Sequence, residues 1–275
     1  MKISTYLMCA AFVGGLVAEA VTVGFFYRDR VQYPYDSVAQ TSVTIDKTPL
    51  SVMQLGDEHV DTIIFSENQN EHINLNYKGI GLTVSDTAKT VSVTMPEYWR
   101  GIIIPEVSGR NMTVVIDYNR LAERLDETGQ LPDFAVVKSD TFRLADIIIP
   151  RGFPIPFVKA ECRRTVYVDS LTADGLCVNV PDRVVLNNCK LASFTNNAGT
   201  FNQLKLDNSY VGRASLNGVR SRFNVECLNS GPDASTTVKS HIDTLAIGKV
   251  KSRPDFNFNK ADIGVVLLKG SSMNR

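Results

Sequence analysis

The sequence predicts an all-β protein: a β-solenoid-like, or β-helix-like, stack of short strands with one short helix, preceded by an N-terminal hydrophobic helix. The main observation is a set of apolar residues that recur at intervals of 18, 20, 19, 20 and 20 residues. These residues are Val168, Leu186, Leu206, Val225, Leu245 and Val265. Rungs of nearly equal length place equivalent residues above one another, as a solenoid requires.

A second observation is a repeated hexapeptide. Residues 186–191 read LNNCKL, and residues 206–211 read LDNSYV. In a solenoid, Leu186 and Leu206 would stack in the interior. Asn188 and Asn208 would stack at a corner, because Asn tolerates turn geometry and its amide can bond to its neighbour in the next rung. A β-sandwich is the alternative, since its strands also recur every 8–12 residues or so.

The strand signals themselves are short β-branched segments between Ser42 and Leu268, bounded by Gly, Pro, Asn and Asp. Four of them are expected to end in proline, which has no N–H to donate to a β-ladder. These prolines are Pro96, Pro105, Pro150 and Pro181. One helix is expected after Asp117 or Asn119, either of which can cap it, and Gly129 is expected to end it.

Residues 1–27 predict a signal peptide or a membrane anchor. Lys2 precedes a long apolar run, and Ala18-Glu19-Ala20 fits a cleavage site. The run continues past Ala20 and is long enough to cross a hydrocarbon layer of roughly 30 Å, which favours the anchor. Residues 28–41 predict a linker and residues 42–275 an extracytoplasmic domain. The expected location is the cell envelope, either periplasmic or at the surface, with anchoring in the inner membrane as one form of it.

Charge and cysteine content narrow the partners. The chain has 29 basic and 29 acidic residues, a net charge of zero that gives no support to a nucleic-acid partner. Four cysteines follow the leader, without CxxC spacing or neighbouring histidines, so zinc and thioredoxin-like chemistry are not expected. They are Cys162, Cys177, Cys189 and Cys227. They could form disulfides in an exported protein or serve as small buried residues, and the sequence does not give a pairing.

No catalytic, cofactor-binding or metal-binding residues are predicted. The chain has no GxSxG elbow and no phosphate-binding glycine loop, and its histidines (His59, His72 and His241) read as surface or turn residues. Polysaccharide-cleaving β-helices cluster carboxylates on adjacent rungs. Here Asp169 and Asp207 fall in equivalent rung positions, but Asn187 occupies the rung between them, so the cluster is incomplete.

A family resemblance rests on two segments. Residues 93–109 read VTMPEYWRGIIIPEVSG, and residues 178–191 read VNVPDRVVLNNCKL. With the N-terminal segment, these resemble the GIN-type domains, also described as autotransporter adhesin head domains, of bacterial cell-envelope proteins. The resemblance covers roughly residues 42–268. The chain departs from the family in having few Gly-Ser-Gly corners and a helix near residue 120. The family implies repeated strand–turn units and provides no catalytic residues to carry over.

The function expected from the sequence is therefore non-enzymatic. It is that of an adhesin-like structural or interaction module of the cell envelope, exported and tethered to the membrane. Its expected partners are the membrane, through the N-terminal segment, and an envelope protein or polysaccharide. One alternative is a carbohydrate-active β-helix enzyme, which would need several acidic or basic side chains converging in one groove. The other is a membrane-tethered envelope sensor domain.

Overall fold

A computed structural model describes residues 40–47, 49–56, 60–131, 134–139, 142–162, 164–219, 222–230, 239–248 and 255–268. The leader predicted over residues 1–27 lies outside these residues, as do most of the linker and His59. None of the helices among the described residues is long and apolar enough to cross a membrane.

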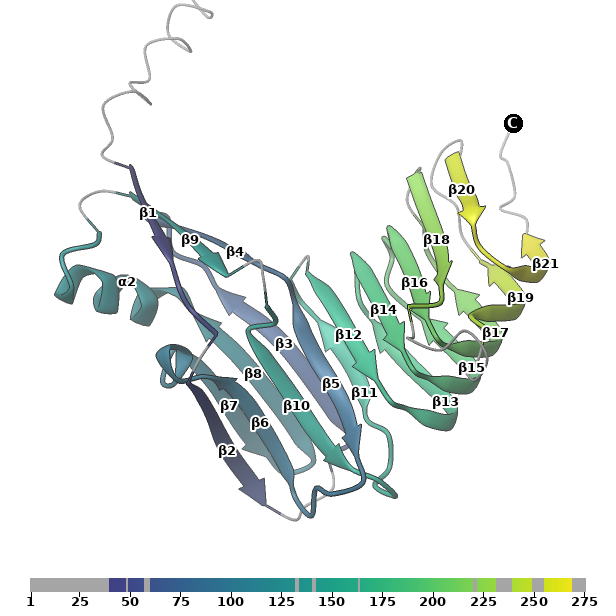
Figure 1. The fold of residues 1–275 in the computed structure, drawn as a ribbon, viewed down its shortest axis with the longest axis horizontal. Coiled ribbons are helices and arrows are strands. Elements are labelled where there is room, and N and C mark those ends of the chain that lie inside the picture. Colours follow the sequence, from purple (N-terminus) through teal and green to yellow (C-terminus); the bar gives the residue numbers. More distant parts are fainter. Residues whose placement is uncertain are drawn as a thin grey trace, which may run out of the picture. The chain divides into compact units, whose positions relative to one another are not determined.

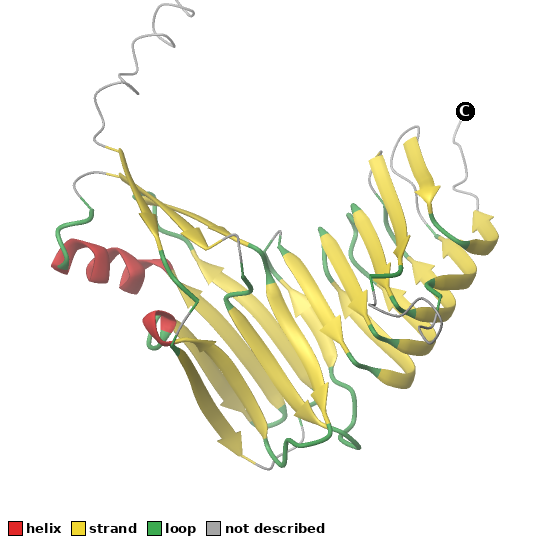
Figure 2. Cartoon of the chain, in the orientation of Figure 1, coloured by secondary structure: helices red, strands yellow, loops and turns green. Residues whose placement is uncertain are grey.

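The fold is all-β, as predicted, with 21 strands in three sheets and one α-helix (Figures 1 and 2). We call the two nine-stranded sheets the front sheet and the back sheet. The front sheet has the order β2-β6-β10-β5-β12-β14-β16-β18-β20. Its strands are β2 (Leu50–Gly56), β5 (Ile80–Ser85), β6 (Val91–Pro96), β10 (Ala145–Pro150), β12 (Thr165–Asp169), β14 (Arg183–Asn187), β16 (Gln203–Asp207), β18 (Arg222–Leu228) and β20 (Asp255–Lys260).

The back sheet has the order β21-β19-β17-β15-β13-β11-β3-β8-β7. Its strands are β3 (Thr62–Asn68), β7 (Ile103–Ser108), β8 (Asn111–Asp117), β11 (Phe157–Ala160), β13 (Thr172–Asn179), β15 (Lys190–Asn196), β17 (Tyr210–Leu216), β19 (His241–Ile247) and β21 (Ile263–Leu268). The third sheet is small and consists of β1 (Gln40–Thr44), β9 (Phe134–Ser139) and β4 (Ile73–Tyr77), in that order.

From β12 onward the chain alternates between the front and back sheets, so that each pair of consecutive strands forms one rung of a solenoid (Figure 1). Successive rungs pair in parallel, at the usual spacing of about 4.8 Å. In the front sheet Val168 pairs with Leu186, and Leu186 pairs with Leu206. All three are fully buried between the two sheets. This stacking of apolar side chains is what the even spacing in the sequence reflects.

The later members of the apolar series do not continue that stack. Val225 pairs with Leu204 rather than with Leu206, and Leu245 lies in the back sheet, where it pairs with Ala214. The reason is an insertion. Lys190 pairs with Tyr210, 20 residues later, whereas Tyr210 pairs with His241, 31 residues later. An extra segment between β18 and β19 therefore moves the later apolar residues to other positions in the rung.

The corner between front and back strands is built from residues with left-handed backbone. Ser170, Asn188 and Asn208 have φ values of 59°, 52° and 50°. The Asn208 amide donates a hydrogen bond to Asn188 Oδ1 at 3.4 Å. Inside the corner, Ser209 Oγ accepts from the Cys189 N–H at 2.9 Å and donates to the Leu186 carbonyl at 2.9 Å. The corner thus satisfies its buried backbone groups through small polar side chains.

We expect Asn188→Ala to lower the free energy of unfolding by about 1–2 kcal/mol, because alanine resists the left-handed conformation. Asn188→Gly should cost much less, since glycine adopts positive φ freely. Both variants lose the amide contact with Asn208, so their difference in urea unfolding isolates the backbone contribution. Equal losses in the two variants would assign the effect to the amide instead.

The N-terminal half adds antiparallel strands to both sheets. In the front sheet β6 pairs antiparallel with β2 and with β10, and in the back sheet β7 pairs antiparallel with β8. Pro96 and Pro150 end their strands, and Pro181 follows β13, as predicted. Pro105 instead lies inside β7. Because β7 is an edge strand paired only with β8, the missing N–H leaves no carbonyl without a partner.

The predicted helix is α2 (Tyr118–Glu127). Asp117 caps it by accepting hydrogen bonds from the backbone N–H groups of Asn119 and Arg120, at 3.0 and 3.3 Å. Leu121 and Leu125 are fully buried. A short 3-10 helix, η1 (Glu97–Trp99), follows β6 and buries the single tryptophan.

The four cysteines after the leader are free thiols. Cys162 and Cys189 are buried, and burial raises the pKa of each thiol to about 12. At neutral pH these two thiols stay protonated. They therefore serve as small core residues rather than as nucleophiles.

Candidate functional site

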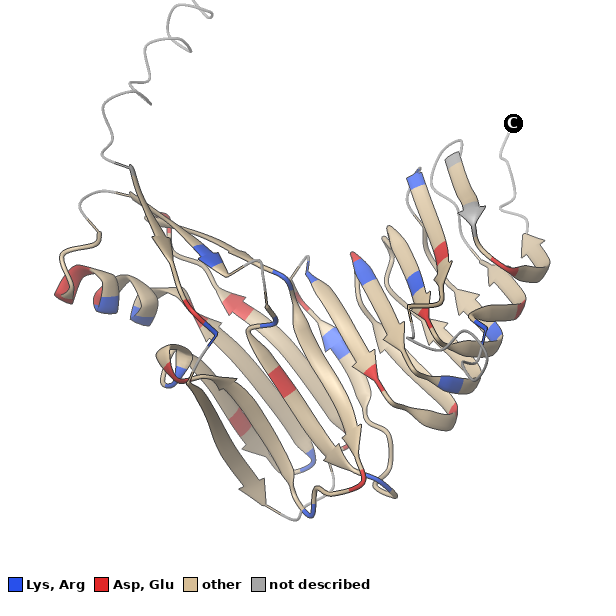
Figure 3. Cartoon of the chain, viewed as in Figure 1, with Lys and Arg blue, Asp and Glu red and all other residues tan. Residues whose placement is uncertain are grey.

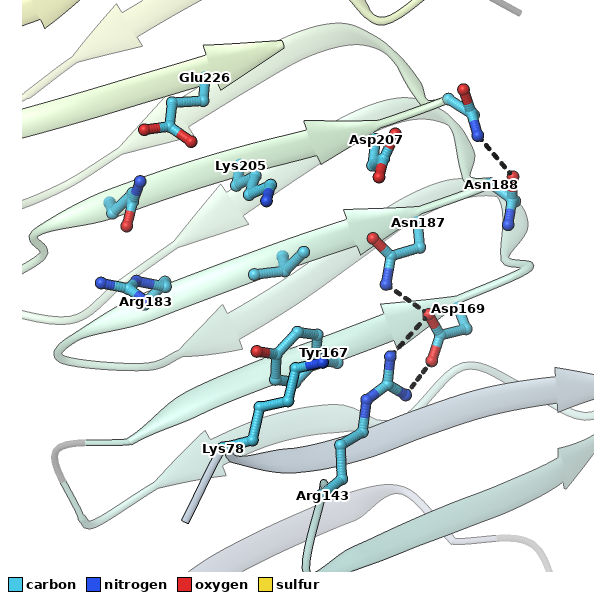
Figure 4. A pocket seen from close by; sticks show the side chains of 13 residues that line it. Lys78, Arg143, Tyr167, Asp169, Arg183, Asn187, Asn188, Lys205, Asp207 and Glu226 are labelled. Carbon is cyan, nitrogen blue, oxygen red and sulfur yellow. Dashed lines mark hydrogen bonds and ion pairs between the residues drawn. The ribbon is translucent and has the colours of Figure 1, made fainter. Parts of the chain in front are cut away.

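The candidate site is a polar groove of about 670 Å³ on the outer face of the front sheet (Figure 4). Its wall is formed by β12, β14, β16 and β18, with Lys78 and Arg143 at one end. The lining residues are Lys78, Arg143, Tyr167, Asp169, Arg183, Val185, Asn187, Asn188, Gln203, Lys205, Asp207, Asn208 and Glu226. Charged side chains of both signs are spread over the strands of this part of the chain (Figure 3).

Strand alternation explains why these side chains face outward. In β16 the burial pattern alternates, with Leu204 and Leu206 inside and Gln203, Lys205 and Asp207 outside. Because the rungs are paired in register, the outward residues form rows across the sheet. One row runs Tyr167, Val185, Lys205, Glu226, and the next runs Asp169, Asn187, Asp207.

One end of the groove is fixed by an ion-pair network around Asp169. The Arg143 guanidinium donates through both terminal nitrogens to the two carboxylate oxygens of Asp169. It also donates to Asp146 at 2.9 Å. Asn187 Nδ2 donates to Asp169 Oδ1 at 2.6 Å. Asp169 is therefore held by charge-assisted hydrogen bonds to its neighbours.

Gly81 makes the Arg143 position available. A Cβ at Gly81 would lie 1.8 Å from Asp146 Oδ1 and 2.8 Å from an Arg143 nitrogen. Without a side chain there, Arg143 can lie across the sheet and stack on the Tyr167 ring, with its central carbon 4.3 Å from the ring centroid. Burial raises the pKa of Tyr167, while the positive charges of Arg143 and Arg183 act in the opposite direction.

The groove does not present the two working carboxylates of a glycosidase. Asp169 and Asp207 do occupy equivalent positions on β12 and β16, with Asn187 between them. Both oxygens of Asp169 are already taken by Arg143, and Asp207 Oδ1 accepts from the Ser230 N–H at 2.9 Å. A general acid or a nucleophile must be free to face the substrate. Within the described residues, no group of three or more His, Cys, Asp or Glu side chains could hold a metal.

The residues singled out from the sequence lie around this groove in two ways. Leu186 and Leu206 are fully buried beneath it, and Asn188 and Asn208 line it at the corner of the rungs. Sequence reasoning did not identify Lys78 or Arg143. Both come from segments outside the repeated rungs, and only strand pairing of β12 with β5 brings those segments beside it.

Fold and site together define a β-solenoid with a polar groove on one face. Comparison with protein-family models and with curated proteins finds no match for the chain. Among solved structures, a "putative adhesin" from Parabacteroides distasonis is similar at 12% identity and a TM-score of 0.32, covering 83% of this chain and 98% of that one. A "putative adhesin" from Parabacteroides merdae is similar at 15% identity and a TM-score of 0.28, covering 84% and 98%.

A "Putative lipid binding protein" from Parabacteroides distasonis is similar at 13% identity and a TM-score of 0.24, covering 83% of this chain and 98% of that one. Similarities this weak carry no argument about function. The argument rests instead on the residues of the groove.

Proposed function

We propose that this chain is a non-enzymatic, adhesin-like interaction module of the cell envelope. In this proposal the N-terminal segment exports the chain and tethers it to the membrane, and the front-sheet groove is the binding face. The GIN-type resemblance of residues 42–268 supports the same assignment. The single observation that carries the proposal is the groove itself, with outward polar side chains aligned in rows across four paired strands.

The physical argument concerns spacing and rigidity. Parallel strands repeat about every 4.8 Å, so each row offers hydrogen-bonding groups at a fixed interval along the stack. A ligand with its own repeat, such as a polysaccharide or an extended peptide, can use several rungs at once. The Arg143–Asp169–Asn187 network fixes one end of this surface before any ligand arrives, which reduces the entropy lost on binding.

The test is a binding assay with the folded domain on immobilised envelope polymers, including peptidoglycan and surface polysaccharides. Gln203→Trp places a large side chain in the groove, and Lys190→Trp, on the exposed outer face of the back sheet, is the matched control. We expect binding to be lost in Gln203→Trp alone, with both variants unfolding at the wild-type temperature.

Two results would contradict the proposal. Equal binding by Gln203→Trp and Lys190→Trp would remove the groove as the binding face. Release of new reducing ends from a bound polysaccharide would favour the carbohydrate-active enzyme instead.

A further inference from the structure

We infer that the ligand of this groove is an acidic polysaccharide, held by three cationic side chains: Lys78, Arg183 and Lys205. This inference rests on the proposed function and narrows its ligand class. It depends on how the charges in the groove are paired, which differs sharply between these three cations and the fourth, Arg143.

Among the described residues, Arg143 has two carboxylate partners, whereas Lys78, Arg183 and Lys205 have none within ion-pair distance. Lys78 and Arg183 are both exposed and lie at the Tyr167 end of the groove. The Lys78 ammonium lies 5.8 Å from the Tyr167 ring centroid. Arg183 begins β14, one rung beyond Tyr167. Two uncompensated cations thus flank one phenol, an arrangement suited to an anionic group.

The carboxylates of the groove do not neutralise these cations. Asp169 is paired with Arg143. Asp207 accepts a backbone N–H from Ser230, and Glu226 accepts from the Asn224 amide at 2.9 Å. Lys205 stands opposite Glu226 in the strand register, yet the pair makes no ion pair. The protein as a whole is neutral, so this local surplus of unpaired cations is a property of the groove rather than of the surface in general.

The rest of the groove fits a carbohydrate. Asn187, Asn188 and Gln203 carry amides that both donate and accept, which matches the dual character of sugar hydroxyls. Arg183 can bind a carboxylate or a sulfate through two parallel hydrogen bonds. Tyr167 is already covered by Arg143, so recognition would come from charge and hydrogen bonds rather than from stacking of a sugar on an aromatic face.

The experiment compares three probes by titration calorimetry on the folded domain: polygalacturonate oligomers, sulfated heparin oligomers and neutral dextran. We expect at least one acidic probe to bind roughly tenfold or more tightly than dextran, and its affinity to fall as salt shortens the screening length from about 30 to 8 Å. The carboxylate and sulfate probes distinguish which acidic group the groove prefers.

The matched variants are Lys78→Gln with Arg183→Gln, and Lys190→Gln as the control on the exposed back-sheet face. Removing both groove cations should weaken acidic binding by roughly tenfold for each charge-assisted hydrogen bond lost, and Lys190→Gln should leave it unchanged. Both groove residues are exposed, so the double variant should fold normally.

The inference is overturned if dextran binds as well as both acidic probes, or if the double variant binds them like the wild type. It is also overturned if only a phosphate polymer, used as a fourth probe, binds. Those outcomes leave the proposed function standing, provided that Gln203→Trp still abolishes binding. The proposed function fails separately, if no envelope polymer binds at all.

Discussion

Leu206→Ala is expected to lower the free energy of unfolding by about 2–5 kcal/mol, the usual cost of removing a fully buried leucine side chain from a core. Leu206 has no exposed surface and lies in β16 between Leu186 on one side and Cys227 on the other. Strands on both sides hold the backbone in place, so the surrounding rungs cannot close the cavity. Urea unfolding followed by circular dichroism measures the change.

Leu268→Ala is the control for this prediction. Leu268 is in β21, the edge strand of the back sheet, and 60% of its surface is exposed even though it pairs with the buried Ile247. With no further rung among the described residues to cover it, its truncation should change stability by no more than about 0.5 kcal/mol. Comparable losses at Leu206 and Leu268 would mean that the stack of rungs does not form the core.

The fold class could be predicted because a solenoid repeats its physics. The interior leucines and corner asparagines of the two hexapeptides obey the same steric rule in each rung, so a short motif is enough to indicate the architecture. The corner chemistry is also local. Asn188 and Asn208 adopt the positive φ that their side chains tolerate better than most.

Other features could not be read in this way because they depend on contacts between distant segments. The insertion between β18 and β19 keeps the period near 20 in the apolar pattern while changing which residues stack. The antiparallel strands β2, β6 and β7 follow no repeat. Arg143 reaches the groove only because β10 pairs with β5 and β5 with β12. No spacing in the sequence indicates that Arg143 will meet Asp169.

A second buried ion pair was also not visible in the sequence, and it supports the other large prediction. Glu67 in β3 has a side chain only 6% exposed. Its carboxylate accepts from Arg164 Nε at 3.0 Å and from the Tyr77 hydroxyl at 2.6 Å. Arg164 also donates to the Leu75 carbonyl at 3.0 Å and lies 4.6 Å from the centroid of the Tyr77 ring. The pair therefore joins the back sheet to the small sheet.

Arg164→Ala should lower the free energy of unfolding by about 3–5 kcal/mol, because it leaves the Glu67 carboxylate buried without a counter-charge. Burial raises the pKa of Tyr77 well above its ordinary value, so its hydroxyl stays protonated and remains the only side-chain donor to Glu67. Adding Glu67→Gln to Arg164→Ala should restore part of the loss, since a neutral amide costs less to bury than an unpaired charge. Chemical denaturation of the two variants gives both numbers.

The matched control is Arg151→Ala, which removes an exposed ion pair of similar length. Arg151 and Asp86 are each 62% exposed and approach to 2.6 Å, so their loss should cost no more than about 1 kcal/mol. If Arg164→Ala were no worse than Arg151→Ala, the Glu67 site would be reached by water. If Glu67→Gln gave no rescue, the contacts of Arg164 with Leu75 and Tyr77, rather than its charge, would account for the loss.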